Sequence, residues 1–128
     1  MTALHKIVLY ASLGVLGVSL LGPGLAGIFR PGVGSHWLVA ETVDARNHLR
    51  ALNAMMAALG LIALWACWDL ARARLLVQAL GLIMALLVVA RLYSWAVDGR
   101  PGASSFLYLA VETAFAAIFL AWPPPRLP

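Results

Sequence analysis

Charged residues are scarce in this sequence. Among its 128 residues, nine are Lys or Arg and five are Asp or Glu, so charged residues make up 11% of the chain. Globular proteins carry about 25% charged residues on average. A small soluble domain keeps much of its surface in contact with water and needs such residues to cover it. The low charge therefore excludes an ordinary soluble domain, and the apolar composition excludes a disordered chain.

Cysteine and clustered positive charge are scarce as well. Cys67 is the only cysteine, which excludes an internal disulfide and a thiolate metal cluster. The net charge is +4, but the arginines are scattered along the chain. Because nucleic-acid binding needs clustered cations, we expect no nucleic-acid partner. We interpret four of the arginines as marks of helix ends at the lipid head groups, namely Arg72, Arg74, Arg100 and Arg126.

Apolar residues are abundant and lie in long runs. They make up 63% of the chain, and the mean hydropathy is +0.92. The runs between charged residues predict transmembrane helices near 5–28, 45–68, 73–97 and 103–122. They lack the alternating polarity of membrane barrel strands. We therefore predict an all-α fold, an integral membrane four-helix bundle that forms a single domain over residues 1–128.

The first apolar run is longer than the core of a secretory signal, which has only about 7–15 apolar residues. We interpret it as a retained helix that is kinked or ended near Pro23. Small residues recur along this helix and the next, with Gly14 and Gly17 in the first and Gly60 in the second. Such residues let two helix backbones approach closely, so we expect these helices to pack tightly.

An even number of spans places both termini on the same side of the membrane. Four basic residues flank the spans on each side, so the excess of positive charge that marks cytoplasmic loops does not decide the orientation. On the side of the first and third loops, the side chains of Arg46 and Arg50 can be engaged in a binding site, which leaves fewer free positive charges on that side. We therefore favour a multi-pass protein of the bacterial inner membrane with cytoplasmic termini.

The informative polar residues lie inside the predicted spans. Ionisable groups within a membrane are costly and normally face the bundle interior, a cavity or one another. Residues three, four or seven apart share a helix face, and three of the helices carry a polar stripe at the same end of the bundle. We predict that the stripes form a pocket. Its residues are Asn47, Arg50, Asn53, Arg91, Ser94, Asp98, Tyr108 and Glu112.

Two of these residues lie deep in the membrane. From the surface formed by the first and third loops, Glu112 lies about 13 Å deep and Arg91 about 10 Å deep, at 1.5 Å per helical residue. We expect these two side chains to pair. Either the pair is a structural lock or it lines a binding site, and both interpretations remain open. Gln78 lies in the apolar half of the third helix, where we expect it to hydrogen-bond across helices.

His48 is the only histidine on the polar part of the second helix, and no second metal ligand accompanies it at helical spacing. We therefore predict no metal site and interpret His48 as a hydrogen-bonded or interfacial residue. Ligation of haem iron by this one imidazole is the alternative. The sequence identifies no cofactor.

These residues resemble a bacterial family of small four-helix membrane proteins that is catalogued as a domain of unknown function. The resemblance extends from about Asp44 to Trp122 and includes the first helix weakly. The segments that carry it are Asn47-His48-Leu49-Arg50, Arg91-x-x-Ser94, Asp98-Gly99-Arg100-Pro101, Glu112 and Trp122. The chain departs from the pattern at Ala90, where glycine is expected. The resemblance implies that the polar residues belong together, and it implies no activity.

A second segment is similar to another group. Residues 48–56, HLRALNAMM, resemble the histidine and asparagine segment of small four-helix haem-containing membrane isomerases that open epoxides. The spacing from His48 to Asn53 is one residue shorter than in that group. This resemblance implies haem at His48.

Three functions from different classes are compatible with the sequence. First, the pocket binds a membrane lipid or a small amphipathic ligand, with Arg50 and Arg91 contacting an anionic head and Glu112 orienting it. Second, the protein is an accessory, supernumerary subunit that stabilises a larger membrane complex, or it forms a homo-oligomer. Third, it is a small membrane isomerase or hydrolase, with or without haem, in which Glu112 or Asp98 acts as acid or base. We rank the three in this order.

Overall fold

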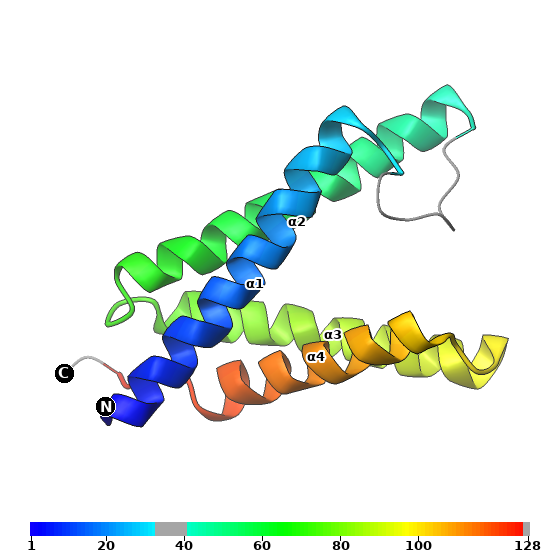
Figure 1. Ribbon diagram of the computed structural model, residues 1–128. Coiled ribbons are helices and arrows are strands. Elements are labelled where there is room, and N and C mark those ends of the chain that lie inside the picture. The colour runs from blue at the N-terminus through cyan, green and yellow to red at the C-terminus, as the bar shows by residue number, and fades with distance from the viewer. Residues whose placement is uncertain (33–40, 127–128) are drawn as a thin grey trace. The chain divides into compact units, whose positions relative to one another are not determined.

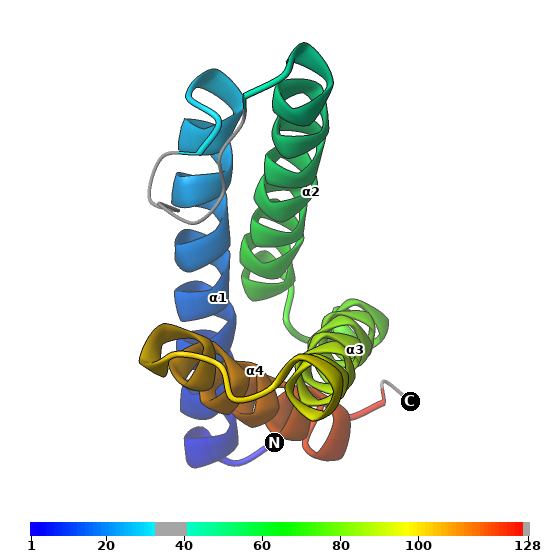
Figure 2. The same cartoon turned by 90° about the vertical axis from the view of Figure 1, so that its right-hand side faces the viewer.

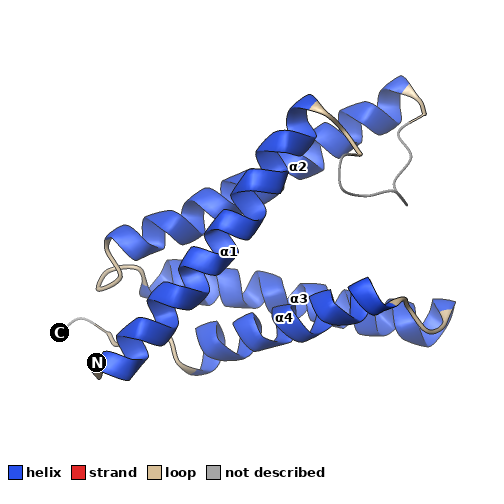
Figure 3. Cartoon of the chain, in the orientation of Figure 1, coloured by secondary structure: helices blue, strands red, loops and turns tan. Residues whose placement is uncertain are grey.

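The computed structural model describes residues 1–32 and 41–126. This part of the chain folds into helices and contains no strand, as Figure 3 shows. The four helices within it are α1 (Ala3–Phe29), α2 (Val43–Trp68), α3 (Arg74–Asp98) and α4 (Ala103–Ala121). No end of a helix differs by more than two residues from its predicted position. The predicted all-α class is confirmed.

Each of these helices is long and apolar enough to cross a membrane, with lengths from 19 to 27 residues. The hydrocarbon core of a bilayer requires about 20 apolar residues in a helix. The chain is therefore a multi-pass membrane protein. At the start of α2, the hydroxyl of Thr42 accepts a hydrogen bond from the N–H of Ala45 over 3.0 Å, which caps the helix. At the end of α3, Gly99 has a φ of +99°, a conformation that glycine adopts without strain.

Helix α1 continues through Pro23 to Phe29, so the alternative that the helix ends near Pro23 is wrong. Proline removes one N–H donor from the helix and leaves the carbonyl of Ser19 without its usual partner. Membrane helices tolerate this loss where neighbouring helices and polar side chains support the backbone. Beyond Pro23 the helix still packs closely, because a Cβ atom built on Gly24 would lie 2.7 Å from the backbone nitrogen of Ala57.

The chain forms two compact units. One unit, Leu13–Trp68, contains most of α1 and all of α2. The other combines Met1–Ser12 with Asp69–Pro128 and contains the first turns of α1 together with α3 and α4. The single domain over residues 1–128 stays a prediction.

In the first unit, α1 and α2 lie side by side and antiparallel (Figure 2). A Cβ atom on Gly60 would lie 2.6 Å from the backbone nitrogen of Leu21 and 2.7 Å from the carbonyl oxygen of Gly17. The two backbones therefore touch at this crossing, which confirms the predicted close packing at Gly17 and Gly60. Gly14 takes no part in it, because a Cβ atom there would meet nothing within 4 Å.

In the second unit, α3 and α4 form an antiparallel hairpin (Figure 1). Its core contains fully or almost fully buried apolar side chains from both helices, namely Val77, Leu80, Met84, Phe115 and Phe119. The first turn of α1 belongs to this unit as well. The ring of His5 stacks on Trp122 with 4.5 Å between ring centroids, and its Nε2 atom hydrogen-bonds the Trp122 carbonyl over 2.8 Å.

Candidate functional site: an ion pair and a cavity between α3 and α4

Arg91 and Glu112 form a bidentate ion pair across the α3–α4 hairpin. The Nε atom of Arg91 donates to Oε2 of Glu112 over 2.6 Å, and its Nη2 atom donates to Oε1 over 2.8 Å. The predicted pairing of these residues is confirmed. They meet because they lie at similar distances from the turn that joins the two antiparallel helices. Parallel double hydrogen bonds of this kind fix the geometry as well as the charge.

The surroundings of the pair are partly buried. The side chain of Glu112 is 12% exposed and that of Arg91 is 35% exposed. The ring of Tyr108 lies beneath the guanidinium group, with 5.3 Å from Cζ of Arg91 to the ring centroid. Pairing lowers the cost of holding two charges at membrane depth. A guanidinium has five N–H groups, and Glu112 uses two of them, so Arg91 keeps donors for another partner.

Next to the ion pair lies a cavity of about 340 Å³, which we name the α3–α4 cavity. Arg91, Ser94 and Ser105 contribute polar atoms to its wall, and Leu87 and Leu109 contribute apolar atoms. The remaining lining residues are Ala90, Trp95 and Pro101. The cavity therefore offers both hydrogen-bonding groups and apolar surface within one small volume.

The turn between α3 and α4 supports the wall of this cavity. Trp95 meets Phe106 edge to face, with 5.0 Å between ring centroids. The guanidinium group of Arg100 lies 5.7 Å from the centroid of the same Phe106 ring. The hydroxyl of Ser94 donates to Oδ2 of Asp98 over 2.7 Å, one turn further along α3. These contacts hold the cavity wall near the end of the hairpin.

The predicted site residues of α2 lie in the other unit. Asn47 is exposed. The Nε atom of Arg50 donates to the carbonyl of Ile28 over 3.1 Å, and the amide of Asn53 donates to the carbonyl of Leu49 over 2.8 Å. The Asn53 side chain also occupies the space beside Gly27. Arg50 and Asn53 thus take part in the packing of α1 and α2, and their convergence with the polar residues of α3 and α4 stays a prediction.

His48 lies exposed on α2. Within residues 1–32 and 41–126, no three His, Cys, Asp or Glu side chains come together in a way that could hold a metal ion. Haem ligation by His48 alone stays the alternative to its predicted hydrogen-bonded or interfacial role.

Sequence analysis did not identify the apolar lining of the α3–α4 cavity. Leu87 and Leu109 lie within one helical turn of Arg91 and Glu112, respectively, but leucine is common throughout the spans and gives no distinct signal. Ala90 lines the cavity at the position where the resemblance leads us to expect glycine. The sequence signal that could have identified these lining residues was their helical spacing from Arg91 and Glu112.

No curated protein and no solved structure matches the chain. A family model does match it over residues 8–123, which is nearly its whole length. The chain therefore belongs to the family described as a domain of unknown function, DUF4345.

Proposed function

We propose that this protein binds a lipid or a small amphipathic molecule in the α3–α4 cavity. The observation that carries the proposal is the composition of the cavity wall. Donors from Arg91 and Ser105 lie beside the apolar side chains of Leu87 and Leu109 within about 340 Å³. Ligand sites in proteins combine a mainly apolar lining with a few placed polar groups.

The ion pair restricts the head group of the ligand. Because Glu112 already balances the charge of Arg91, the cavity favours an uncharged or zwitterionic head rich in hydrogen-bond acceptors, such as an ester or a hydroxyl. This differs from the anionic head inferred from the sequence, where Arg50 was expected to add a second positive charge.

The volume of the cavity restricts the ligand further. Small-molecule sites commonly have volumes of about 300–1,000 Å³, and this cavity lies at the lower end of that range. It therefore has room for a head group and the first methylenes. The rest of an acyl chain would lie in the bilayer along the apolar surface of the hairpin.

The test is native mass spectrometry of protein extracted from its own membrane in a mild detergent. Wild type is compared with Ser105→Leu, which places a bulky side chain in the cavity. Ser104→Leu is the matched control, because Ser104 is exposed on α4 and does not line the cavity.

We expect a defined small-mass adduct on the wild type and on Ser104→Leu, and its loss from Ser105→Leu. Chemical extraction of the adduct then identifies the molecule. A wild-type protein without an adduct, or equal retention by the two variants, would overturn the proposal.

No comparable observation supports either of the two alternative functions. For the accessory-subunit hypothesis, Gly17 and Gly60 would let a partner helix approach closely, yet both are used in the packing of α1 against α2. For the isomerase or hydrolase hypothesis, both acidic candidates are already hydrogen-bonded, Glu112 by Arg91 and Asp98 by Ser94.

We also propose that the protein lies in the bacterial inner membrane with cytoplasmic termini. The basic residues on the terminal side of the spans are Lys6, Arg72, Arg74 and Arg126. On the other side, Arg50 is bonded to a backbone carbonyl, and Arg100 lies over an aromatic ring. On the terminal side Arg74 is likewise bonded to a backbone carbonyl and Arg72 lies beside Asp69, so two basic residues are engaged on each side. These contacts do not distinguish the two sides, and reporter fusions decide the orientation.

A further inference from the structure

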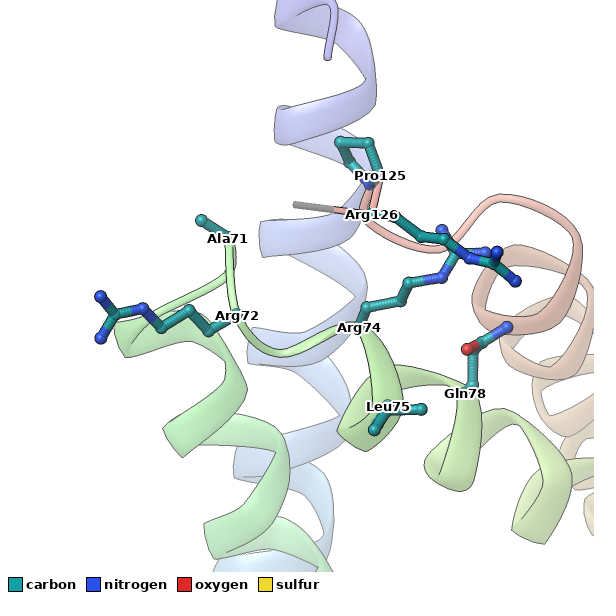
Figure 4. Close-up of a pocket in the computed structure, with 7 residues that line it drawn as sticks. All are labelled: Ala71, Arg72, Arg74, Leu75, Gln78, Pro125 and Arg126. Carbon is teal, nitrogen blue, oxygen red and sulfur yellow. The ribbon is translucent and has the colours of Figure 1, made fainter. Parts of the chain in front are cut away.

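A second cavity, of about 380 Å³, lies where α3 begins, and we name it the arginine cavity. Its wall combines residues of the turn before α3, the first turns of α3 and the segment after α4. In Figure 4 the side chains of Arg74, Arg126 and Gln78 extend toward the same space, while that of Arg72 points away. Two guanidinium groups and an amide from distant parts of the sequence therefore meet at one place.

Specific contacts hold the segment after α4 against α3. The Nη1 atom of Arg74 donates to the carbonyl of Pro124, and the side chain of Pro124 is fully buried. The carbonyl of Trp122 accepts the hydrogen bond of His5. Because residues 122–124 are fixed in this way, Arg126 is held close to the first turns of α3, and the cavity is formed in advance of any ligand.

The arginine cavity is strongly positive. Arg72 has an acidic neighbour, since its Nε atom lies 3.7 Å from Oδ2 of Asp69. In the described part of the chain, no carboxylate lies within ion-pair distance of Arg74 or Arg126. Gln78, which we expected to bond across helices, makes no side-chain hydrogen bond within residues 1–32 and 41–126, so its amide is available to a ligand.

The start of α3 adds further positive potential. Its N-cap residue, Ala73, makes no side-chain hydrogen bond to the helix. The first N–H groups of a helix have no partners within the helix, and the helix dipole is positive at this end. An anion in the arginine cavity would lie beside these groups as well as beside the two guanidinium groups.

We infer that Arg74, Arg126 and Gln78 bind a phosphate group. Arginine presents a planar fork of donors that matches the oxygens of phosphate, and an amide adds one more donor. With 25 residues, α3 is about 37 Å long, which exceeds the roughly 30 Å of the hydrocarbon core and brings its ends to the level of the head groups. Leu75 lines the same cavity and is exposed, so it offers apolar surface to an acyl chain. The phosphate group therefore comes from an anionic membrane phospholipid. This inference involves none of the residues of the α3–α4 cavity.

The test measures thermal unfolding of the full chain in detergent by tryptophan fluorescence, with three added probes. Phosphatidylglycerol carries the phosphate, a diacylglycerol with the same acyl chains lacks it, and inorganic phosphate lacks the chains. The variant is Arg126→Gln, since Arg126 is exposed and lies outside the helices. Arg72→Gln is the matched control, which removes the same charge from the same end of the unit while leaving both inferred guanidinium ligands in place. Circular dichroism establishes that both variants are folded.

We expect phosphatidylglycerol to raise the unfolding temperature of the wild type and of Arg72→Gln, and diacylglycerol to have no such effect. In Arg126→Gln the concentration needed for the same shift should rise roughly tenfold or more, as expected for the loss of a charged hydrogen bond. In a third outcome, inorganic phosphate raises the unfolding temperature of the wild type but not that of Arg126→Gln, and phosphatidylglycerol has no effect. The site then binds free phosphate and not a phospholipid. Equal losses in both variants, an unchanged response of Arg126→Gln, or no response to either phosphate probe would overturn the inference.

Discussion

The two charged residues at membrane depth, Arg91 and Glu112, are tolerated because each has a partner of opposite charge. Arg91 would be costly alone in the hydrocarbon region, and so would Glu112. Together they form a nearly neutral unit with two short hydrogen bonds and an aromatic ring on one side. The stability of the hairpin therefore depends on both partners being charged.

Glu112→Gln should expose this dependence. The amide cannot balance the charge of Arg91, which remains partly buried, so we expect the variant to lose about 2 kcal/mol of unfolding free energy. The measurement is unfolding in mixed micelles with increasing denaturing detergent. The control is Asp98→Asn, since Asp98 is an exposed partner of Ser94 and should change the stability by less than about 0.5 kcal/mol. Equal stabilities of Glu112→Gln and wild type would show that the pair does not support the fold.

The sequence allowed the ion pair to be predicted, but it did not reveal the contacts that form the arginine cavity. Arg91 and Glu112 are rare charges in long apolar runs, and both lie at similar depth from one turn. By contrast, Arg74 and His5 bond to backbone carbonyls of the segment after α4. Every residue has a carbonyl, so such an acceptor leaves no pattern in a sequence. The interpretation of Arg74 as a mark of the helix end was therefore correct in position but incomplete in its contacts.

At the scale of the elements, the ends of the helices could be predicted because charged residues, glycine and proline mark them. Asp98 and Gly99 end α3, for example, and the turn before α4 contains Pro101. The effect of Pro23 could not be predicted in the same way. Proline ends helices in water, whereas a membrane helix can continue through it when a neighbouring helix packs close by.

The closeness of that packing leads to a prediction for Gly60→Ala. The added methyl group would collide with backbone atoms of α1, at Leu21 and Gly17, which cannot rotate out of the way. We expect α1 and α2 to separate locally, at a cost of about 1–3 kcal/mol of unfolding free energy. Gly14→Ala is the control, because its new methyl group meets nothing within 4 Å. Its higher helix propensity should leave the stability unchanged or raise it by up to about 1 kcal/mol. Similar losses in both variants would contradict this account of the helix crossing.

At the scale of the whole molecule, the order of the helices determines which ends share a side of the membrane. An even number of spans in the described residues returns the chain to its starting side, so Lys6 and Arg126 lie on one side and Arg100 lies on the other. The count of spans could be predicted from hydropathy alone. Which helix the polar face of α2 packs against could not be derived in the same way, because stripes on separate helices specify a face but not a neighbour.

Reporter fusions provide the test of orientation. Green fluorescent protein attached after Arg126 should fluoresce, since it folds in the cytoplasm. Alkaline phosphatase inserted in the turn at Gly99 should be active, since it requires the periplasm. The exchanged fusions, with phosphatase after Arg126 and the fluorescent protein at Gly99, should both be silent. The opposite pattern would place the termini outside the cytoplasm.

The bond between His5 and Trp122 has a consequence for the way in which the chain is made. The two residues are 117 positions apart, and on the ribosome the first is synthesised long before the second. The bond can therefore form only after α4 and Trp122 have been synthesised. A chain that stops before Trp122 lacks the partner of His5, so its amino-terminal turn stays unattached to the segment after α4.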